Sequence, residues 1–242
     1  MAKSSKDRDR RAVIEQMRRE QKRGERRRTS MIIGACVVVA LAIVAVPAWQ
    51  VFQQEKAAAG DLETIGVSAD AASCDDLVTA PAEGNNEHKP EGSAVVFDDA
   101  PPAFGPHYPS PAPFARKYYS AADRPDLAYL VHNLEHGYNI LWYDETVADD
   151  SDQLAAVKAI ATKFEGQALT DKFIAAPWTE EDGKPFPDGK HVALTHWSLG
   201  GGDGDPAEQV GVWQYCAAPS GEVVAEFAEK YPFSDSPEPQ AL

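Results

Sequence analysis

His132-Asn-Leu-Glu-His-Gly137 is followed at once by Tyr138-Asn-Ile-Leu-Trp-Tyr143, near the middle of a chain of 242 residues. A helix that opens at Pro125 and closes at Gly137 places the two histidines four residues apart on one face, with the glutamate beside them. The run that follows is rich in the aromatic and β-branched residues typical of strands. The stretch therefore predicts a helix-to-strand corner that carries ionisable groups.

Five other runs of the chain show the pattern of a regular element. Three are short and β-rich, which predicts strands, and two repeat apolar residues at the spacing of one helix face. They are residues 94–97, 173–176 and 191–197 for the strands, and 151–164 and 221–231 for the helices. Ser151 is suited to cap the first helix and Ser220 to start the second. The predicted class is α+β, a two-layer domain in which helices cover a small sheet.

A strongly basic start precedes an uncharged apolar stretch. The first thirty residues hold twelve Lys or Arg against five Asp or Glu, whereas the whole chain has a net charge of -15. Residues 31–51 carry no charge, and about 20 apolar residues span the hydrocarbon core of a bilayer. We therefore predict a basic cytoplasmic segment over residues 1–30 and a single transmembrane helix over 31–51 in the plasma membrane, because Lys and Arg resist translocation. A topology signal accounts for the basic residues, so no nucleic-acid partner is expected.

The rest of the chain is then expected outside the membrane. Residues 52–73 are small and acidic and predict a stalk, and residues 74–233 have the size of one exported α+β domain. Residues 234–242 are polar and proline-rich, which predicts a disordered tail. Cys74 and Cys216 are the two cysteines of the exported part, and an oxidising compartment favours one disulfide between them over a pair of metal thiolates.

All six histidines lie in the exported domain, which makes metal binding the main hypothesis for its chemistry. A second segment, Pro101-Pro-Ala-Phe-Gly-Pro-His-Tyr108, adds a third imidazole to the two in the central stretch. The domain contains no methionine and its thiols are predicted to pair, so the soft ligands of a Cu(I) carrier are missing and Zn(II) or Cu(II) remain. The predicted metal site consists of His107, His132, Glu135 and His136, with His88 as a further member.

Two alternatives stay open beside metal binding without hydrolysis. His-x-x-Glu-His is the inverted zinc-peptidase motif, in which both histidines bind zinc and the glutamate activates water, although the chain turns extended directly after Gly137. The other alternative is a structural role, with His132 and His136 bonded to backbone at the corner. His191 and His196 lie on opposite faces of one predicted strand, so only one of them can face a given site.

Taken together, these segments resemble the bacterial family of domain of unknown function 3105. The resemblance covers roughly residues 74–238, and Ala103-Phe104 departs from it by replacing a small polar pair. It implies one N-terminal span, an exported domain and a shared site, and a respiratory membrane complex is a candidate partner by similarity of build to some actinobacterial proteins. The residues that carry the resemblance are Pro101, Pro102, Gly105, Pro106, His107, His132, Leu134, Glu135, His136, Gly137, Tyr143, Trp213 and Cys216.

The sequence thus predicts a membrane-anchored, extracytoplasmic accessory protein with a His/Glu site for a divalent metal. A zinc-dependent hydrolase and a structural subunit of a membrane complex are the alternative functions. The sequence itself names neither a substrate nor a partner.

Overall fold

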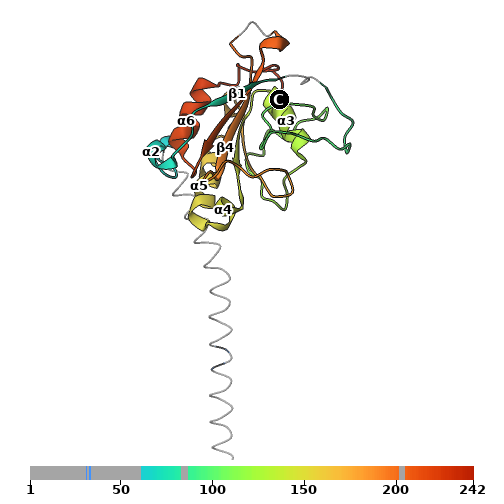
Figure 1. Ribbon diagram of the computed structural model, residues 1–242. Helices are drawn as coiled ribbons and strands as arrows, with labels where there is room; N and C mark the ends of the chain where they lie inside the picture. The colour runs from blue at the N-terminus through green and yellow to red at the C-terminus, as the bar shows by residue number, and fades with distance from the viewer. Residues whose placement is uncertain (1–30, 32, 34–60, 83–86, 202–204) are drawn as a thin grey trace, which may run out of the picture. The chain divides into compact units, whose positions relative to one another are not determined.

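The computed structural model describes residues 31, 33, 61–82, 87–201 and 205–242 (Figure 1). Among these residues, none of the helices has the length and apolar character that a membrane span requires. The predicted cytoplasmic segment, the transmembrane helix and residues 52–60 of the stalk lie outside the described residues, apart from Met31 and Ile33. Those three assignments remain predictions.

Short helices and strands alternate along the described chain, with η denoting a 3-10 helix. In order they are η1 (Leu62–Thr64), α2 (Ala69–Ala72), β1 (Val78–Pro81), α3 (Leu127–Glu135), β2 (Asn139–Tyr143), α4 (Glu145–Asp149), α5 (Ser151–Thr162), η2 (Leu169–Asp171), β3 (Phe173–Pro177), β4 (Val192–Ser198), η3 (Pro206–Glu208), β5 (Val210–Cys216) and α6 (Gly221–Lys230).

A five-stranded mixed sheet forms the centre of the domain, in the order β1-β5-β4-β2-β3. β2 and β3 run parallel, and α4 and α5 connect them along the chain. The other three neighbouring pairs are antiparallel, with Leu141 of β2 opposite Leu194 of β4. The predicted α+β class is confirmed, and three of the predicted strands form as β2, β3 and β4.

Both faces of this sheet are covered, since every residue of β2 and β3 is buried. Successive side chains of a strand point to opposite faces. Leu141 and Tyr143 pack on the face that α5 and α6 cover, whereas Ile140 and Trp142 pack on the face covered by α3 and the irregular chain before it. Figure 1 shows α6 and α3 on opposite sides of the sheet. The domain therefore has three layers, where two were predicted.

The predicted strand over residues 94–97 does not form, and Val96 is 84% exposed. A β-rich run becomes a strand only where a neighbour completes its hydrogen-bond ladder. The two strands that complete the sheet, β1 and β5, come instead from runs that were not predicted as strands. Composition thus identified the central strands but failed for a surface segment.

Both predicted helices after the central corner form, as α5 and α6. Ser220 caps α6 as expected, because its hydroxyl accepts a hydrogen bond from a backbone N–H of the first turn. The cap of α5 is Asp150, one residue earlier than the predicted Ser151, and its carboxylate accepts from two N–H groups of the first turn. An acidic cap also suits the positive end of the helix dipole.

The folded domain begins earlier than predicted. Residues 61–73, expected to belong to the stalk, form η1 and α2 and pack near α6. Ile65 and Ala72 are 5% and 0% exposed, and the N–H of Gly221 donates to the carbonyl of Ile65 at 2.8 Å. A Cβ at Gly221 would lie 1.9 Å from the carbonyl oxygen of Leu62, so the absence of a side chain permits this close approach.

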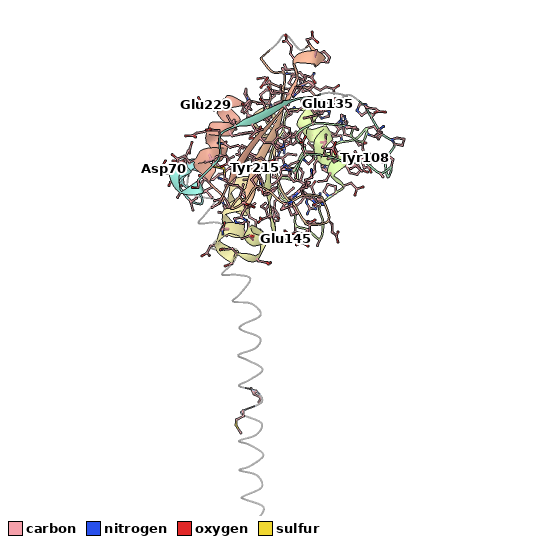
Figure 2. The ribbon with its side chains drawn as sticks, in the orientation of Figure 1. Asp70, Tyr108, Glu135, Glu145, Tyr215 and Glu229 are labelled. Atoms are coloured by element: carbon pink, nitrogen blue, oxygen red, sulfur yellow. A yellow bond between two sulfur atoms is a disulfide. The ribbon has the colours of Figure 1, made fainter. Side chains whose placement is uncertain are left out.

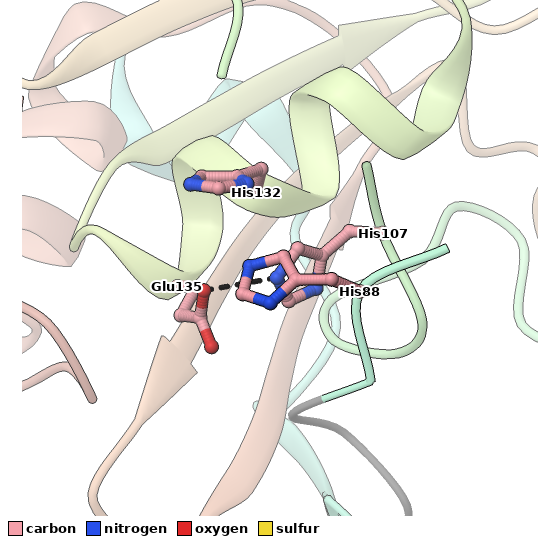
Figure 3. A group of neighbouring side chains, drawn as sticks. All are labelled: His88, His107, His132 and Glu135. Atoms are coloured by element: carbon pink, nitrogen blue, oxygen red, sulfur yellow. Dashed lines mark ion pairs between the residues drawn. The ribbon is translucent and has the colours of Figure 1, made fainter. Parts of the chain in front are cut away.

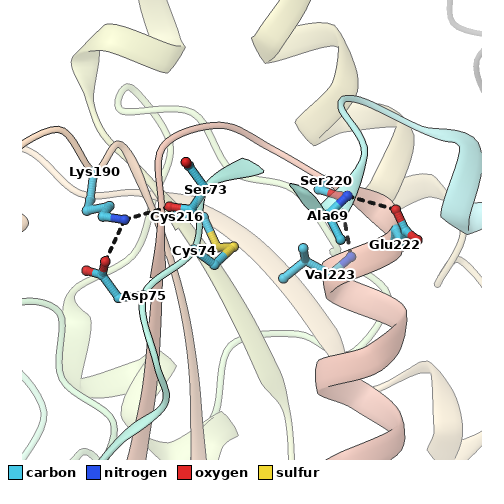
Figure 4. Close-up of a disulfide and its surroundings, with 9 residues drawn as sticks. All are labelled: Ala69, Ser73, Cys74, Asp75, Lys190, Cys216, Ser220, Glu222 and Val223. Carbon is cyan, nitrogen blue, oxygen red and sulfur yellow. Dashed lines mark hydrogen bonds and ion pairs between the residues drawn. A yellow bond between two sulfur atoms is a disulfide. The ribbon is translucent and has the colours of Figure 1, made fainter. Parts of the chain in front are cut away.

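Cys74 and Cys216 form the predicted disulfide, which closes a sequence separation of 142 residues (Figure 4). It joins the segment before β1 to the last residue of β5. Lys190 strengthens this junction, because its ammonium donates to the carbonyl of Ser73 and lies 2.6 Å from the carboxylate of Asp75. Covalent and ionic contacts thus fix the start of the domain to the sheet.

The C-terminal segment, residues 234–242, is ordered against the domain and not a disordered tail as predicted. Asp235 accepts two hydrogen bonds at the end of β4, and Ser236 is fully buried. The ammonium of Lys172 donates to two carbonyls of the segment and to that of His136. Polar composition suggested disorder, but hydrogen bonds to backbone groups hold the segment without a large apolar surface.

Candidate metal centre

Four ionisable side chains converge on the α3 side of the sheet (Figure 3). His132 and Glu135 come from α3, whereas His88 and His107 come from the irregular chain before it. Each residue offers one ligand atom, and these four atoms all lie within 4.8 Å of one another. His107, His132 and Glu135 are 0%, 5% and 3% exposed, while His88 is exposed. Four of the five residues predicted for the metal site are thus brought together.

Helix geometry and a short backbone bridge set these positions. His132 and Glu135 are three residues apart on α3 and are therefore neighbours on one helix face. The N–H of Lys89 donates to the carbonyl of His107 at 2.8 Å, and this bridge holds His88 beside His107. The centroids of these two imidazole rings are 4.8 Å apart.

The segment 101–107, which delivers His107, is anchored on the sheet by aromatic side chains. The indole N–H of Trp213 donates to the first carbonyl of the segment at 2.7 Å. The ring of Phe104 packs edge-on against Trp213 and Trp197, and a Cβ at Gly211 would lie 2.4 Å from that ring. The residue that departs from the family pattern therefore fills the core beneath the site.

Backbone carbonyls orient two of the histidines. Nδ1 of His107 lies 2.8 Å from the carbonyl oxygen of Gly105, and Nδ1 of His132 contacts the carbonyl oxygen of Tyr108. A carbonyl only accepts, so each Nδ1 carries a proton, and a neutral ring then presents the lone pair of Nε2. Metal-binding histidines usually have this second hydrogen bond, which fixes both tautomer and ring orientation.

The contact between His107 and Glu135 brings two potential ligand atoms together inside the protein. Nε2 of His107 lies 2.9 Å from Oε2 of Glu135, and the two side chains form an ion pair when His107 is protonated. A buried carboxylate needs such a positive partner, because an unpaired charge inside the protein costs free energy. A cation shared between the two atoms would satisfy both.

His136, the fifth predicted ligand, lies beside this cluster at the C-cap of α3. Its Nε2 is 2.9 Å from Nε2 of His132 and 3.6 Å from a carboxylate oxygen of Glu238. His136, Glu238 and Glu135 form a second group whose ligand atoms lie within 4.8 Å of one another. The structure thus divides the predicted residues between two adjoining groups that share Glu135.

The pKa shifts favour the protonation states that bind metals. Burial lowers the pKa of His132, and burial together with the neighbouring His132 lowers the pKa of His136 to about 4. Burial would raise the pKa of Glu135, but the contact with His107 outweighs it, so this pKa is lowered. Burial would lower the pKa of His107, yet Glu135 and a backbone carbonyl raise it. Protons therefore compete with a metal mainly at His107.

The two remaining histidines stay outside the cluster. Nδ1 of His191 contacts the carboxylate of Asp144 at 2.8 Å. His196 is fully buried on the helix-covered side, where its nitrogens lie 3.2 and 2.7 Å from the carbonyl oxygens of Tyr138 and Asp235. Neither ring belongs to the groups of described residues whose ligand atoms could share a metal ion.

Two residues of the site region were not predicted from the sequence. Glu238 lies in a short, proline-rich segment with no periodic pattern, and Lys172 is a lone basic residue before a strand. Their roles depend on the C-terminal segment folding back onto the end of α3, where the N–H of Glu238 donates to the carbonyl of Glu135 at 3.0 Å. No local sequence signal announces that contact.

Comparison with known protein families agrees with the motif-based resemblance. The sequence model of the family described as "Protein of unknown function (DUF3105)" matches residues 88–242, which include every residue of both groups. No curated protein and no solved structure matches the chain. The site therefore has to be interpreted from its own geometry.

Proposed function

Given that the chain belongs to DUF3105, a family of proteins of unknown function, we propose that it is an accessory protein that binds a divalent metal ion. The ligands are His88, His107, His132 and Glu135. One observation carries this proposal: four potential ligand atoms, two from α3 and two from the irregular chain before it, lie within 4.8 Å of one another, and three of the side chains are buried. Ligands bound at about 2.1 Å to a tetrahedral ion are about 3.4 Å apart. The distances among these four atoms lie on both sides of this value, from 2.9 Å between His107 and Glu135 up to at most 4.8 Å, so small shifts of the side chains form the site.

The donor set favours Zn(II) or Cu(II). Three imidazoles and one carboxylate supply only nitrogen and oxygen, which suit these ions. The thiols of Cys74 and Cys216 are consumed in the disulfide, and the three methionines all precede residue 32. A thiolate-dependent blue-copper centre is therefore disfavoured.

The position of Glu135 favours a binding site over the zinc-peptidase alternative. In the peptidase mechanism this glutamate activates a water molecule and does not bind the metal. Here its Oε2 lies 2.9 Å from Nε2 of His107, an additional imidazole that the peptidase motif does not include. The carboxylate thus stands among the ligands, which is the arrangement of a closed site.

The disulfide supports placing the domain in an oxidising, extracytoplasmic compartment. With the apolar stretch over residues 31–51, this supports a single-pass protein of the plasma membrane with its C-terminal domain outside. An accessory role beside another membrane complex, a respiratory complex among them, fits such a location. Co-purification of a partner from membranes with the tagged chain tests this part of the proposal.

The metal site is tested by elemental analysis of the full chain, purified in detergent after folding in an oxidising compartment. At least one equivalent of zinc or copper is expected to remain bound through gel filtration. His107→Gln should lose it, because this substitution removes a fully buried ligand. His191→Gln is the matched control, since that ring contacts Asp144 away from the cluster. Metal content in the native chain no higher than in His107→Gln would overturn the proposal.

A further inference from the structure

The group formed by Glu135, His136 and Glu238 adjoins the centre described above and shares Glu135 with it. We propose that this group binds a second divalent cation, with the Glu135 carboxylate bridging the two ions and the C-terminal segment supplying Glu238. This inference rests on the proposed metal-binding function, because the bridge needs the first ion. It adds a site to which the sequence motif contributed only two of three ligands.

The distance between His136 and Glu238 fits two ligands of one ion better than a direct contact. Nε2 of His136 and Oε2 of Glu238 are 3.6 Å apart, beyond a normal hydrogen bond. Two ligands at about 2.1 Å from a tetrahedral ion are separated by about 3.4 Å. The separation of these two atoms is close to this ligand–ligand distance, so little movement is required.

The hydrogen bonds of His132 and His136 give a second reason. Because the carbonyl of Tyr108 holds the Nδ1 proton of His132, its Nε2 can only accept from Nε2 of His136 at 2.9 Å. A metal at His132 takes that lone pair and leaves the Nε2 proton of His136 without an acceptor. Loss of this proton to solvent, with protonation of the unpartnered Nδ1 of His136 instead, gives Nε2 the lone pair that a second ion requires.

The backbone on both sides of Glu238 fixes its position over the site. Its own N–H donates to the carbonyl of Glu135 at 3.0 Å. The ammonium of Lys172 donates to the carbonyls of Pro239 and Ala241 at 2.8 and 2.7 Å, and to that of His136 at 2.7 Å. The lysine thus clamps the C-terminal segment to the end of α3.

The exposure of Glu238 distinguishes the second position from the first. Its side chain is 54% exposed, whereas those of His107 and Glu135 are 0% and 4% exposed. Two ions held by two carboxylates and neutral imidazoles leave a net positive charge, which weakens the second binding step. The second ion should therefore bind more weakly, exchange faster and keep solvent ligands.

Titration of the full, metal-free chain with Cu(II) or Zn(II) tests this inference. Two equivalents are expected, and Glu238→Gln should weaken the second at least tenfold while the first is unchanged. Glu238→Asp, which keeps the charge but shortens the reach, should give an intermediate loss. Glu229→Gln is the matched control, because Glu229 is an exposed acid on α6, away from the site (Figure 2).

Electron paramagnetic resonance of the Cu(II)-loaded chain adds a readout that a merely structural role would not change. Two copper ions bridged by a carboxylate should couple magnetically, and Glu238→Gln should restore the signal of an isolated ion. Binding of only one equivalent of metal by the native chain would overturn the proposed second site and leave the first intact. A second equivalent that still binds to Glu238→Gln would have the same meaning. Absence of any bound metal would overturn both proposals together.

Discussion

The two faces of the sheet differ in how they are built and in what they carry. One is covered by α5 and α6, whose apolar stripes pack on Leu141, Leu194 and their neighbours. The other is covered by α3 and an irregular segment that holds the histidine cluster. Figure 2 shows Asp70 and Glu229 on the helical side and Tyr108 and Glu135 on the opposite side. The sheet thus separates a face packed by regular helices from a face that combines a second hydrophobic core with the histidine cluster.

This separation has a physical reason. Regular helices satisfy their own backbone groups and can devote one face to apolar packing. An irregular segment instead leaves carbonyls free, and two of these, from Gly105 and Tyr108, orient the site histidines. The irregular segment packs less regularly than a helix, but its free carbonyls orient the histidine ligands.

Removing the disulfide on the helical side should give the largest effect on stability. Cys74→Ser with Cys216→Ser frees a loop of 142 residues, which costs about 5 kcal/mol in the chain-entropy account. Urea unfolding of the full chain, followed by tryptophan fluorescence, measures this loss. Native chain treated with a reductant is the control for the substitutions themselves.

The same double variant tests whether the two faces are independent. Its metal content under folding conditions should match that of the native chain, since Cys216 packs with the helical core. If the double variant lost metal as well as stability, the two faces would not be independent, because the site would then depend on the helical layer. A stability loss under about 1 kcal/mol would contradict the entropic role of the crosslink.

The site side should dominate the pH dependence of stability in chelator-treated protein. His136 has a folded pKa of about 4 against 6.5 in its ordinary state, so the unfolded chain binds its proton first. Stability should therefore fall as pH decreases from about 6.5 to 4, by at most about 3 kcal/mol for this group. The lowered pKa of His132 acts in the same direction. His107 acts in the opposite direction because its pKa is raised. Its contribution to stability is fully present below pH 6.5 and is lost as the pH rises through its folded pKa.

Denaturant midpoints measured across this pH range separate the effect of His136 on stability from the effect of acid on the rest of the protein. The difference between the native chain and His136→Gln should shrink or reverse as the pH falls. Identical pH curves for the native chain and His136→Gln would contradict this assignment.

The helical side was the more predictable of the two. The apolar spacing of α5 and α6 and the Ser220 cap are local patterns, and both helices form where expected. β5 was not recognised, because Gly211 and Gln214 interrupt its β-rich character. β1 is a short edge strand that ends at Pro81, which a pattern of apolar alternation does not identify.

The site side was predictable only where ligands share a motif. His132, Glu135 and His107 lie in short strings that already suggested chemistry, and the structure brings them together. Glu238 was missed because its approach depends on the C-terminal segment returning to α3 across about a hundred residues of chain. The predicted boundary between stalk and domain was wrong for a similar reason, since Ile65 is buried in a core cluster formed by residues distant in the sequence, α6 among them.

Gly137→Ala is the substitution with the smallest expected effect, and it tests how firmly the C-terminal segment is held on the site side. Gly137 has φ +90°, and a Cβ there would lie 2.3 Å from the carbonyl oxygen of Phe233 and 2.6 Å from the hydroxyl of Ser236. A loss of about 2 kcal/mol is expected from backbone strain together with this steric conflict. Gly189→Ala is the matched control: its φ is +73° but nothing lies within 4 Å, so it reports strain alone.

The displaced C-terminal segment should also carry Glu238 away from the site. Gly137→Ala should therefore weaken the second metal equivalent, whereas Gly189→Ala should leave both equivalents unchanged. Calorimetric melting and metal titration of the two variants measure both effects on the same samples. Equal stability losses in the two variants would mean that the C-terminal segment yields at little cost, and Glu238 would then be held too loosely to define a site.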